Sequence, residues 1–226
     1  YPSMYVTPWF EAINNKPLQE YPRPQLVRNS YISLNGYWDF EVNKLPLTST
    51  YSKSILVPFS PETVASGLAM TINPDDFMHY RRFFTLSDDF MLDRVLLNFE
   101  AVDQECYVYV NTMKVGTQIG GYDSFSIEIT DFIRPGNNEL VVRVVDQTEK
   151  SGYVRGKQKL NNKGKMISIF YTPNSGIWQS VWLESVPNNY VKHVDIVPNF
   201  DDASFDITIY SLMDDYANVH VFDKSG

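Results

Sequence analysis

Short runs of apolar and alternating residues recur along this chain, and each run is bounded by glycine, proline, asparagine or aspartate. The clearest of these runs are Arg81–Leu86, Arg94–Phe99, Glu105–Val110, Ser124–Ile129 and Glu139–Val145. Runs of this length and spacing are typical of strands in a β-sandwich. No segment keeps an apolar period of 3.6 residues over three turns, so helices should be few and the sheets antiparallel. The sequence therefore predicts an all-β fold.

An earlier strand is predicted from Leu34 onward, where side chains alternate after the turn-forming pair Asn35-Gly36. Trp38 falls on the same face as two other apolar residues, which favours a place in the core over a role in stacking on a sugar. Cys106 alternates with valines in the same way. It should therefore be a small buried side chain and not a nucleophile.

The two ends of the chain differ from this middle region. Residues 1–28 carry five prolines, which fix backbone torsions and remove amide donors, so this arm should run irregularly over the surface. After Pro187 the strand pattern restarts, and three strands are expected, at Val191–Val197, Ser204–Tyr210 and Asn218–Phe222. An immunoglobulin-like sandwich needs about seven strands. We therefore expect two domains, 1–187 and an incomplete 188–226, with the second packed on the first, paired with a second copy, or mobile.

Charge and composition exclude several classes of partner. Lys and Arg total 19 against 27 Asp and Glu, for a net charge of −8, which opposes binding to nucleic acid or to an anionic membrane surface. The apolar runs are far shorter than the ~20 residues that a membrane span needs. The single cysteine rules out an internal disulfide framework and, with no signal peptide visible, favours a cytoplasmic location.

No metal or cofactor site is predicted. The three histidines are scattered and no cysteine pair exists, so a transition metal has no ligand set. Four aspartate doublets, beginning at Asp75, Asp88, Asp201 and Asp214, supply the oxygen ligands that calcium prefers. Each doublet lies near a proline, a phenylalanine or an element boundary, where aspartate commonly starts turns, and we favour that interpretation.

Several separated motifs carry a family resemblance. They are Leu34–Phe40, Leu96–Asp103, Val108–Asn111, Gly120–Phe125, Gly136–Leu140 and the aromatic-rich segment Ser175–Glu184. In order and spacing they resemble the N-terminal sugar-binding domain of glycoside hydrolase family 2. One departure is the pair Asn111-Thr112, where that family usually has Asn-Gly in a tight hairpin turn. Thr112 tolerates a positive φ poorly, so the turn type there is expected to differ.

The resemblance implies a jelly-roll β-sandwich of the galactose-binding type, followed in a full enzyme by an immunoglobulin-like sandwich and a catalytic barrel. Members of the family cleave β-glycosidic bonds with retention, using two glutamates ~5–5.5 Å apart. Neither glutamate motif occurs in this chain, so no catalytic residue is expected here. The chain would be the inactive N-terminal part of a hydrolase, most similar to β-galactosidases, with a carbohydrate substrate bound through the missing barrel. A homo-oligomer remains open.

Two loops are candidates for contact with substrate. The resemblance places the loop from Arg155 to Ser175 near the active site of the parent enzyme, and we name Arg155, Lys157 and Gln158 as candidate sugar-binding residues. Polar side chains of this kind bind ligand hydroxyls in many sites. The alternative is a loop that only braces the next domain. Phe170 stands near the position where lactose-cleaving relatives have an acidic residue, so that contact is expected to be missing.

The second loop contains Ser60 and Glu62, and the alternative there is a turn with a solvated carboxylate. Trp178 and Trp182 share a strand face that we expect a neighbouring domain to cover. Two other functions remain open for the whole chain, namely a free-standing carbohydrate-binding module and a structural interaction domain, because jelly rolls serve many purposes.

Overall fold

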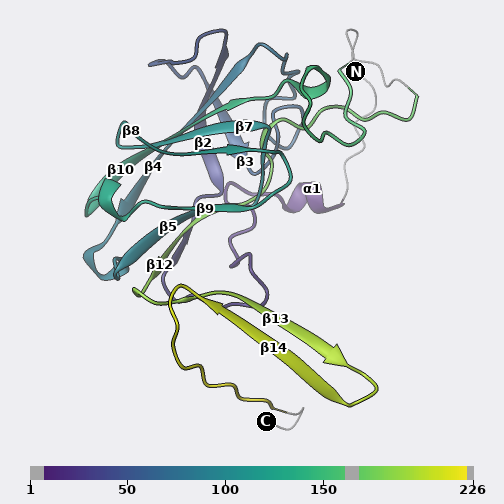
Figure 1. The fold of residues 1–226 in the computed structure, drawn as a ribbon. Helices are drawn as coiled ribbons and strands as arrows, with labels where there is room; N and C mark the ends of the chain where they lie inside the picture. Colours follow the sequence, from purple (N-terminus) through teal and green to yellow (C-terminus); the bar gives the residue numbers. More distant parts are fainter. Residues whose placement is uncertain (1–7, 161–167, 223–226) are drawn as a thin grey trace.

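The computed structural model describes residues 8–160 and 168–222, and most of these belong to two antiparallel sheets that face each other. Figure 1 shows the two layers, one above the other. The smaller sheet has the order β1-β12-β5-β9, with the bounds β1 Tyr31–Ser33, β12 Val181–Val186, β5 Arg94–Phe99 and β9 Phe125–Glu128. The larger sheet has the order β3-β2-β4-β10-β7-β8, with the bounds β3 Lys53–Val57, β2 Gly36–Asn43, β4 Phe77–Leu86, β10 Gly136–Val145, β7 Glu105–Val110 and β8 Met113–Ile119. The predicted all-β sandwich is confirmed.

Within residues 8–160 and 168–222, helical structure is limited to short pieces at the edges of the sandwich. These are one turn of α-helix, α1 Pro8–Ala12, and the 3-10 turns η1 Asp88–Phe90, η2 Thr130–Phe132 and η3 Thr148–Lys150. A two-stranded piece, β6 Val102–Asp103 with β11 Gly176–Ile177, joins the two layers at one end. Among the residues described, no helix has both the length and the apolar character needed to cross a membrane.

The core lies between the two sheets and is rich in aromatic side chains. Trp38 and Phe40 of β2 and Tyr80 of β4 are fully buried there, and the Trp38 indole donates to the Leu34 carbonyl at 2.8 Å. Cys106 is also fully buried, and burial raises the pKa of its thiol to about 12. Trp38 and Cys106 are therefore core residues, as predicted.

The sequence pattern located the central strands better than the edge strands. The bounds of β5 and β7 agree with the predicted runs, and β4 and β10 begin a few residues before them. The pattern did not find β1, β3 or β8. In β8 all side chains are exposed or half-buried, so it lacks the alternation that marks a strand. The glycine at position 116 weakens the strand pattern further. A side chain is excluded there, because a Cβ would meet Ile127 Cδ1 at 2.5 Å.

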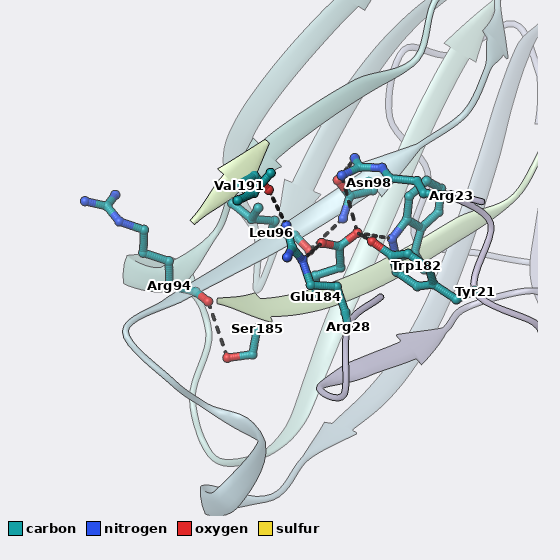
Figure 2. A network of polar contacts seen from close by, with 10 residues as sticks. All are labelled: Tyr21, Arg23, Arg28, Arg94, Leu96, Asn98, Trp182, Glu184, Ser185 and Val191. Carbon is teal, nitrogen blue, oxygen red and sulfur yellow. Dashed lines mark hydrogen bonds and ion pairs between the residues drawn. The ribbon is translucent and has the colours of Figure 1, made fainter. Parts of the chain in front are cut away.

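The N-terminal arm crosses the outer face of the smaller sheet and is held there by Glu184 of β12. The Glu184 side chain is fully buried although it carries a carboxylate. It accepts hydrogen bonds from the Tyr21 hydroxyl at 2.9 Å, from Arg28 Nε at 3.1 Å and from the Trp182 indole at 2.7 Å. Arg23 pairs with the same carboxylate at 3.6 Å. Figure 2 shows these side chains converging on Glu184.

The arm also covers Trp182, which we had expected a neighbouring domain to cover. The Arg23 guanidinium lies 5.4 Å from the centroid of the Trp182 ring, and only 3% of Trp182 is exposed. That expectation is therefore wrong for Trp182. The cover comes from the arm of the same chain, whose arginines are attracted to both the ring and the carboxylate beside it.

Beyond Pro187, a hairpin of β13 Val191–Asn199 and β14 Ser204–Ser211 extends away from the sandwich. Figure 1 shows this hairpin at the end of β12, with the following segment returning beside it. A third strand was expected at Asn218–Phe222. This expectation is wrong, since those residues have no regular secondary structure. They line a groove of about 440 Å³ together with apolar side chains of the hairpin. An immunoglobulin-like assignment for this region stays a prediction.

Candidate functional site

Several polar side chains from separate loops meet at the end of the sandwich where β6 pairs with β11. In the register of this pair Gly176 lies opposite Asp103. Asp146 follows the last residue of β10, and Glu62 lies in the loop after β3. The loop from Arg155 to Ser175 reaches the same place at both of its ends, and residues 161–167 of this predicted loop lie outside the described residues. We call Glu62, Asp103, Asp146, Gln158 and Ser175 the carboxylate cluster.

Gln158 holds the two ends of the loop together. Its Nε2 donates to Asp103 Oδ2 at 3.0 Å and to the Tyr122 hydroxyl at 3.2 Å, and its Oε1 accepts from the Asn174 amide at 2.6 Å. Its backbone also forms an isolated parallel bridge with Tyr171. Both ends of the Gln158 side-chain amide are therefore used within the protein, which makes this residue a brace for the loop.

Glu62 and Asp146 hold the C-terminal end of the same loop at Ser175. The Ser175 amide donates to Glu62 Oε2 at 3.2 Å, and its hydroxyl donates to Asp146 Oδ2 at 2.6 Å. Asp146 Oδ1 accepts from the Thr148 amide at 2.6 Å. Ser175 is 1% exposed, so these bonds form out of contact with water. The predicted second loop and the predicted first loop are thus joined through Ser175.

Burial makes the charged form of this cluster unfavourable. Burial, and to a smaller degree the charges of Asp146 and Glu62, raise the pKa of Asp103 to about 7. Burial also raises the pKa of Glu62 above its usual range. Among the residues described, Asp103 Oδ1 and Glu62 Oε1 have no hydrogen-bond partner. The cluster therefore takes up a proton more readily than isolated carboxylates do.

The stability of the protein should depend on pH through Asp103. Its pKa is raised on folding, so between about pH 4 and pH 7 unfolding releases a proton. The contribution of Asp103 to stability is therefore full below about pH 4 and is lost as pH rises toward 7. We expect the free energy of unfolding to fall by ~2–4 kcal/mol over this range, at 1.36 kcal/mol for each unit of pKa. Urea unfolding at several pH values measures this slope.

Two variants identify the source of the slope. Asp103→Asn should remove most of it, because the amide does not titrate. Asp131→Asn, at an exposed aspartate of η2, should leave it in place. A slope that persists unchanged in Asp103→Asn would contradict the assignment to Asp103.

The remaining candidate residues have different surroundings. Arg155 Nη1 donates to the Gln158 carbonyl at 3.1 Å and pairs with Glu149 at 3.4 Å, so its side chain links the start of the loop to η3. Lys157 is exposed, with its Nζ 5.9 Å from the centroid of the Tyr171 ring. Ser60 is 2% exposed, and its hydroxyl has no partner among the described residues. Of the five candidates, Lys157 is the one whose side chain is open to a ligand.

Three members of the site were not singled out from the sequence, namely Asp103, Asp146 and Tyr122. Asp146 follows directly after the predicted strand Glu139–Val145, and Asp103 ends the motif Leu96–Asp103, four residues after the predicted strand Arg94–Phe99. Strand ends that meet at one edge of a sandwich bring such residues together, and this was the available signal. Within the described ranges, no three His, Cys, Asp or Glu side chains are grouped so that they could hold a metal ion.

Residues 9–187 match the model of the glycosyl hydrolases family 2, sugar binding domain. Since this match covers most of the chain, the chain belongs to glycoside hydrolase family 2. It is 30% identical over 132 residues to a β-galactosidase of Thermoanaerobacter pseudethanolicus, covering 58% of this chain and 17% of that protein. It is 38% identical over 100 residues to a candidate β-glucuronidase of Formosa agariphila, covering 44% of this chain and 11% of that protein.

The fold is similar to that of solved relatives. A β-glucuronidase of an uncultured Clostridium species superposes with a TM-score of 0.61 at 19% identity, over 83% of this chain and 35% of that one. A β-glucuronidase of Ruminococcus gnavus, solved with D-glucuronic acid, gives a TM-score of 0.62 at 21% identity, over 87% of this chain and 36% of that one. The chain thus spans about a third of these structures and less than a fifth of the two curated relatives above. The predicted family is confirmed.

Proposed function

We propose that this chain is the N-terminal, non-catalytic part of a retaining hydrolase that cleaves β-glycosidic bonds, with β-galactosides as the first substrate class to test. The family match and the relatives named as β-galactosidases support this proposal. The chain itself contributes a braced loop at one end of a sandwich. Its role would be to shape access to a sugar site that a catalytic domain completes.

The observation that carries this proposal is the bracing of the loop at both ends. Gln158 binds Asp103, Tyr122 and Asn174, while Glu62 and Asp146 bind Ser175. Bonds of this kind to buried carboxylates hold a loop in one conformation, and a contact that orients a substrate needs such a support. Burying polar side chains costs free energy unless they form hydrogen bonds. That these side chains are buried and bonded to the loop supports a role in fixing the conformation of the loop.

In the enzyme that contains this domain, Lys157→Ala is expected to raise KM for an aryl β-galactoside by about tenfold and to leave kcat nearly unchanged. A hydrogen bond from a charged donor contributes about 1.5 kcal/mol or more, and 1.4 kcal/mol is a factor of ten in binding. Steady-state kinetics of the purified enzyme measures the change. Lys114→Ala, at an exposed lysine of β8, is the matched control and should not alter KM.

A second comparison separates the loop's two roles. Gln158→Ala should raise KM as Lys157→Ala does and should also lower thermal stability, because three hydrogen bonds are lost. Unchanged KM values in both variants would leave the loop as a structural brace only. Aryl β-glucuronides and β-mannosides, assayed in parallel, establish which sugar the enzyme cleaves.

A further inference from the structure

A pocket of about 290 Å³ opens at the end of the sandwich opposite the carboxylate cluster. It is lined by Phe83 of β4, by Thr112 in the turn between β7 and β8, and by Arg134, Asn137 and Glu139 around the start of β10. β10 has ten residues and runs from this pocket to Val145, next to Asp146. At ~3.4 Å for each residue the two places are roughly 30 Å apart. The pocket is therefore separate from the loop described above.

The pocket has an aromatic surface that is already positioned. Phe83 is 50% exposed, and Glu139 lies directly opposite it in the register of β4 and β10. The Arg81 guanidinium lies 5.2 Å from the centroid of the Phe83 ring and 4.0 Å from the Glu139 carboxylate. Asp39 in turn fixes Arg81 with two hydrogen bonds, at 2.8 and 3.0 Å. The ring and the carboxylate are thus held in place before any ligand arrives.

The polar groups of the pocket fall into two sets. Asn111 and Asn138 bind each other at 2.8 Å, and Asn111 Oδ1 accepts from the Glu139 amide, so their amides are used in closing the turn. In the part of the chain that the structure describes, no hydrogen bond is made by the Thr112 hydroxyl or the Asn137 side chain, and the Glu139 carboxylate has only its distant ion pair. These groups remain available to a ligand.

Thr112 adopts a backbone conformation that its side chain disfavours. Its φ is +72° and that of Asn111 is +48°, which are the signs of the type I′ turn that Asn-Gly would form. The expectation that the turn type differs is therefore wrong, since Thr112 occupies the position of a glycine. A β-branched residue in the left-handed region is a genuine outlier, and such strain clusters at functional sites. Here it places a hydroxyl-bearing side chain on the pocket wall.

We propose that this pocket binds a neutral pyranose, with the C–H face of the sugar on Phe83 and its hydroxyls on Glu139, Arg134, Asn137 and Thr112. A half-exposed aromatic ring provides an apolar, polarisable surface. Sugar hydroxyls both donate and accept, which suits a carboxylate acceptor beside a guanidinium donor. The Glu139 carboxylate repels a uronate or a phosphate, and of the two arginines near it Arg81 is already paired with Asp39. Binding of a sugar in this pocket would not require hydrolase activity.

Titration of the ¹⁵N-labelled chain with methyl β-galactoside, methyl β-glucoside and glucuronate tests the proposal. We expect the amides of Thr112, Asn137 and Glu139 to shift with a neutral glycoside, with Kd on the order of 1–10 mM, as is usual for an open site with few contacts. Glucuronate should bind several times more weakly. No shift at these amides with either neutral glycoside, or tighter binding of glucuronate, would overturn the proposal.

Three variants sharpen the test. Phe83→Ala should weaken binding at least tenfold, whereas Phe205→Ala, at an aromatic residue of the hairpin that is 58% exposed, should not change it. Thr112→Gly relieves the strained φ, so it should raise the thermal midpoint by about 2–4 °C while weakening binding severalfold. A stabilised Thr112→Gly with full affinity would show that Thr112 has no part in the site, and unaltered binding in Phe83→Ala would rule out the pocket. Hydrolase activity is not used in these measurements, so their failure leaves the proposed function in place.

Discussion

Replacing Glu184 with alanine is expected to lower the free energy of unfolding by about 3–5 kcal/mol. The carboxylate is fully buried and accepts hydrogen bonds from Tyr21, Arg28 and Trp182. Without it, the Arg28 guanidinium, whose side chain is 16% exposed, is left without its counter-charge. Removing one partner of a buried ion pair costs about this much, because the remaining charge is not solvated. Equilibrium unfolding in urea measures the loss.

Glu128 provides the matched control, since it is also a strand glutamate paired with an arginine. Its ion pair with Arg94 is shorter, at 2.7 Å, but 44% of the Glu128 side chain is exposed. Exposed pairs contribute about 0.2–1 kcal/mol, so Glu128→Ala should cost less than 1 kcal/mol. Equal losses in the two variants would show that burial does not set the energy of the Glu184 network. The arm should also become accessible to protease in Glu184→Ala and stay protected in Glu128→Ala.

Gly176→Ala is expected to destabilise the sandwich by about 3–5 kcal/mol. Gly176 has a φ of +75°, and a Cβ there would overlap the Tyr80 hydroxyl and approach Met78 Sδ to 3.2 Å. Backbone strain of this kind costs ~1–3 kcal/mol, and overpacking of a core costs a further 1–3 kcal/mol. Tyr80 is fully buried, so it has no room to move away. The loss is measured by urea or thermal unfolding.

Two further variants separate these contributions. Gly152→Ala should change stability by less than ~0.5 kcal/mol, because nothing lies within 4 Å of a Cβ at that position and its φ is not positive. Combining Gly176→Ala with Tyr80→Phe removes the overlapping oxygen, so the double variant should recover part of the loss that the two single variants predict together. Strict additivity would mean that the overlap with Tyr80 contributes nothing.

The central strands were predictable from sequence because burial on one face imposes alternation. Trp38 and Cys106 follow that rule, and both lie in the core. The strands β1, β3 and β8, which were not predicted, lie at sheet edges, and β8 has no buried side chain. The edge strand β9 was predicted, because its side chains still alternate between half-buried and exposed. The strand expected near Val219 failed for a related reason. Its apolar residues face the hairpin groove without joining a ladder.

The candidate site was predictable in part. Glu62 and Gln158 were named from two separate loops, and the structure brings both loops together at Asn174 and Ser175. The buried aspartates between them were not named, because burial of a carboxylate depends on contacts between strands far apart in sequence. The cover on Trp182 was missed for the same reason. It depends on how a proline-rich arm folds back, which no local pattern encodes.

The place of β1 in the smaller sheet has a consequence for how the protein is made. β1 pairs with β12, and Tyr31 lies opposite Glu184. β1 therefore waits for β12 to be translated before it can pair, on the order of ten seconds at 5–20 residues per second. Until then the apolar surface that β12 fills stays open to other chains. Translation speed over this stretch should consequently influence how much of the protein reaches its native state.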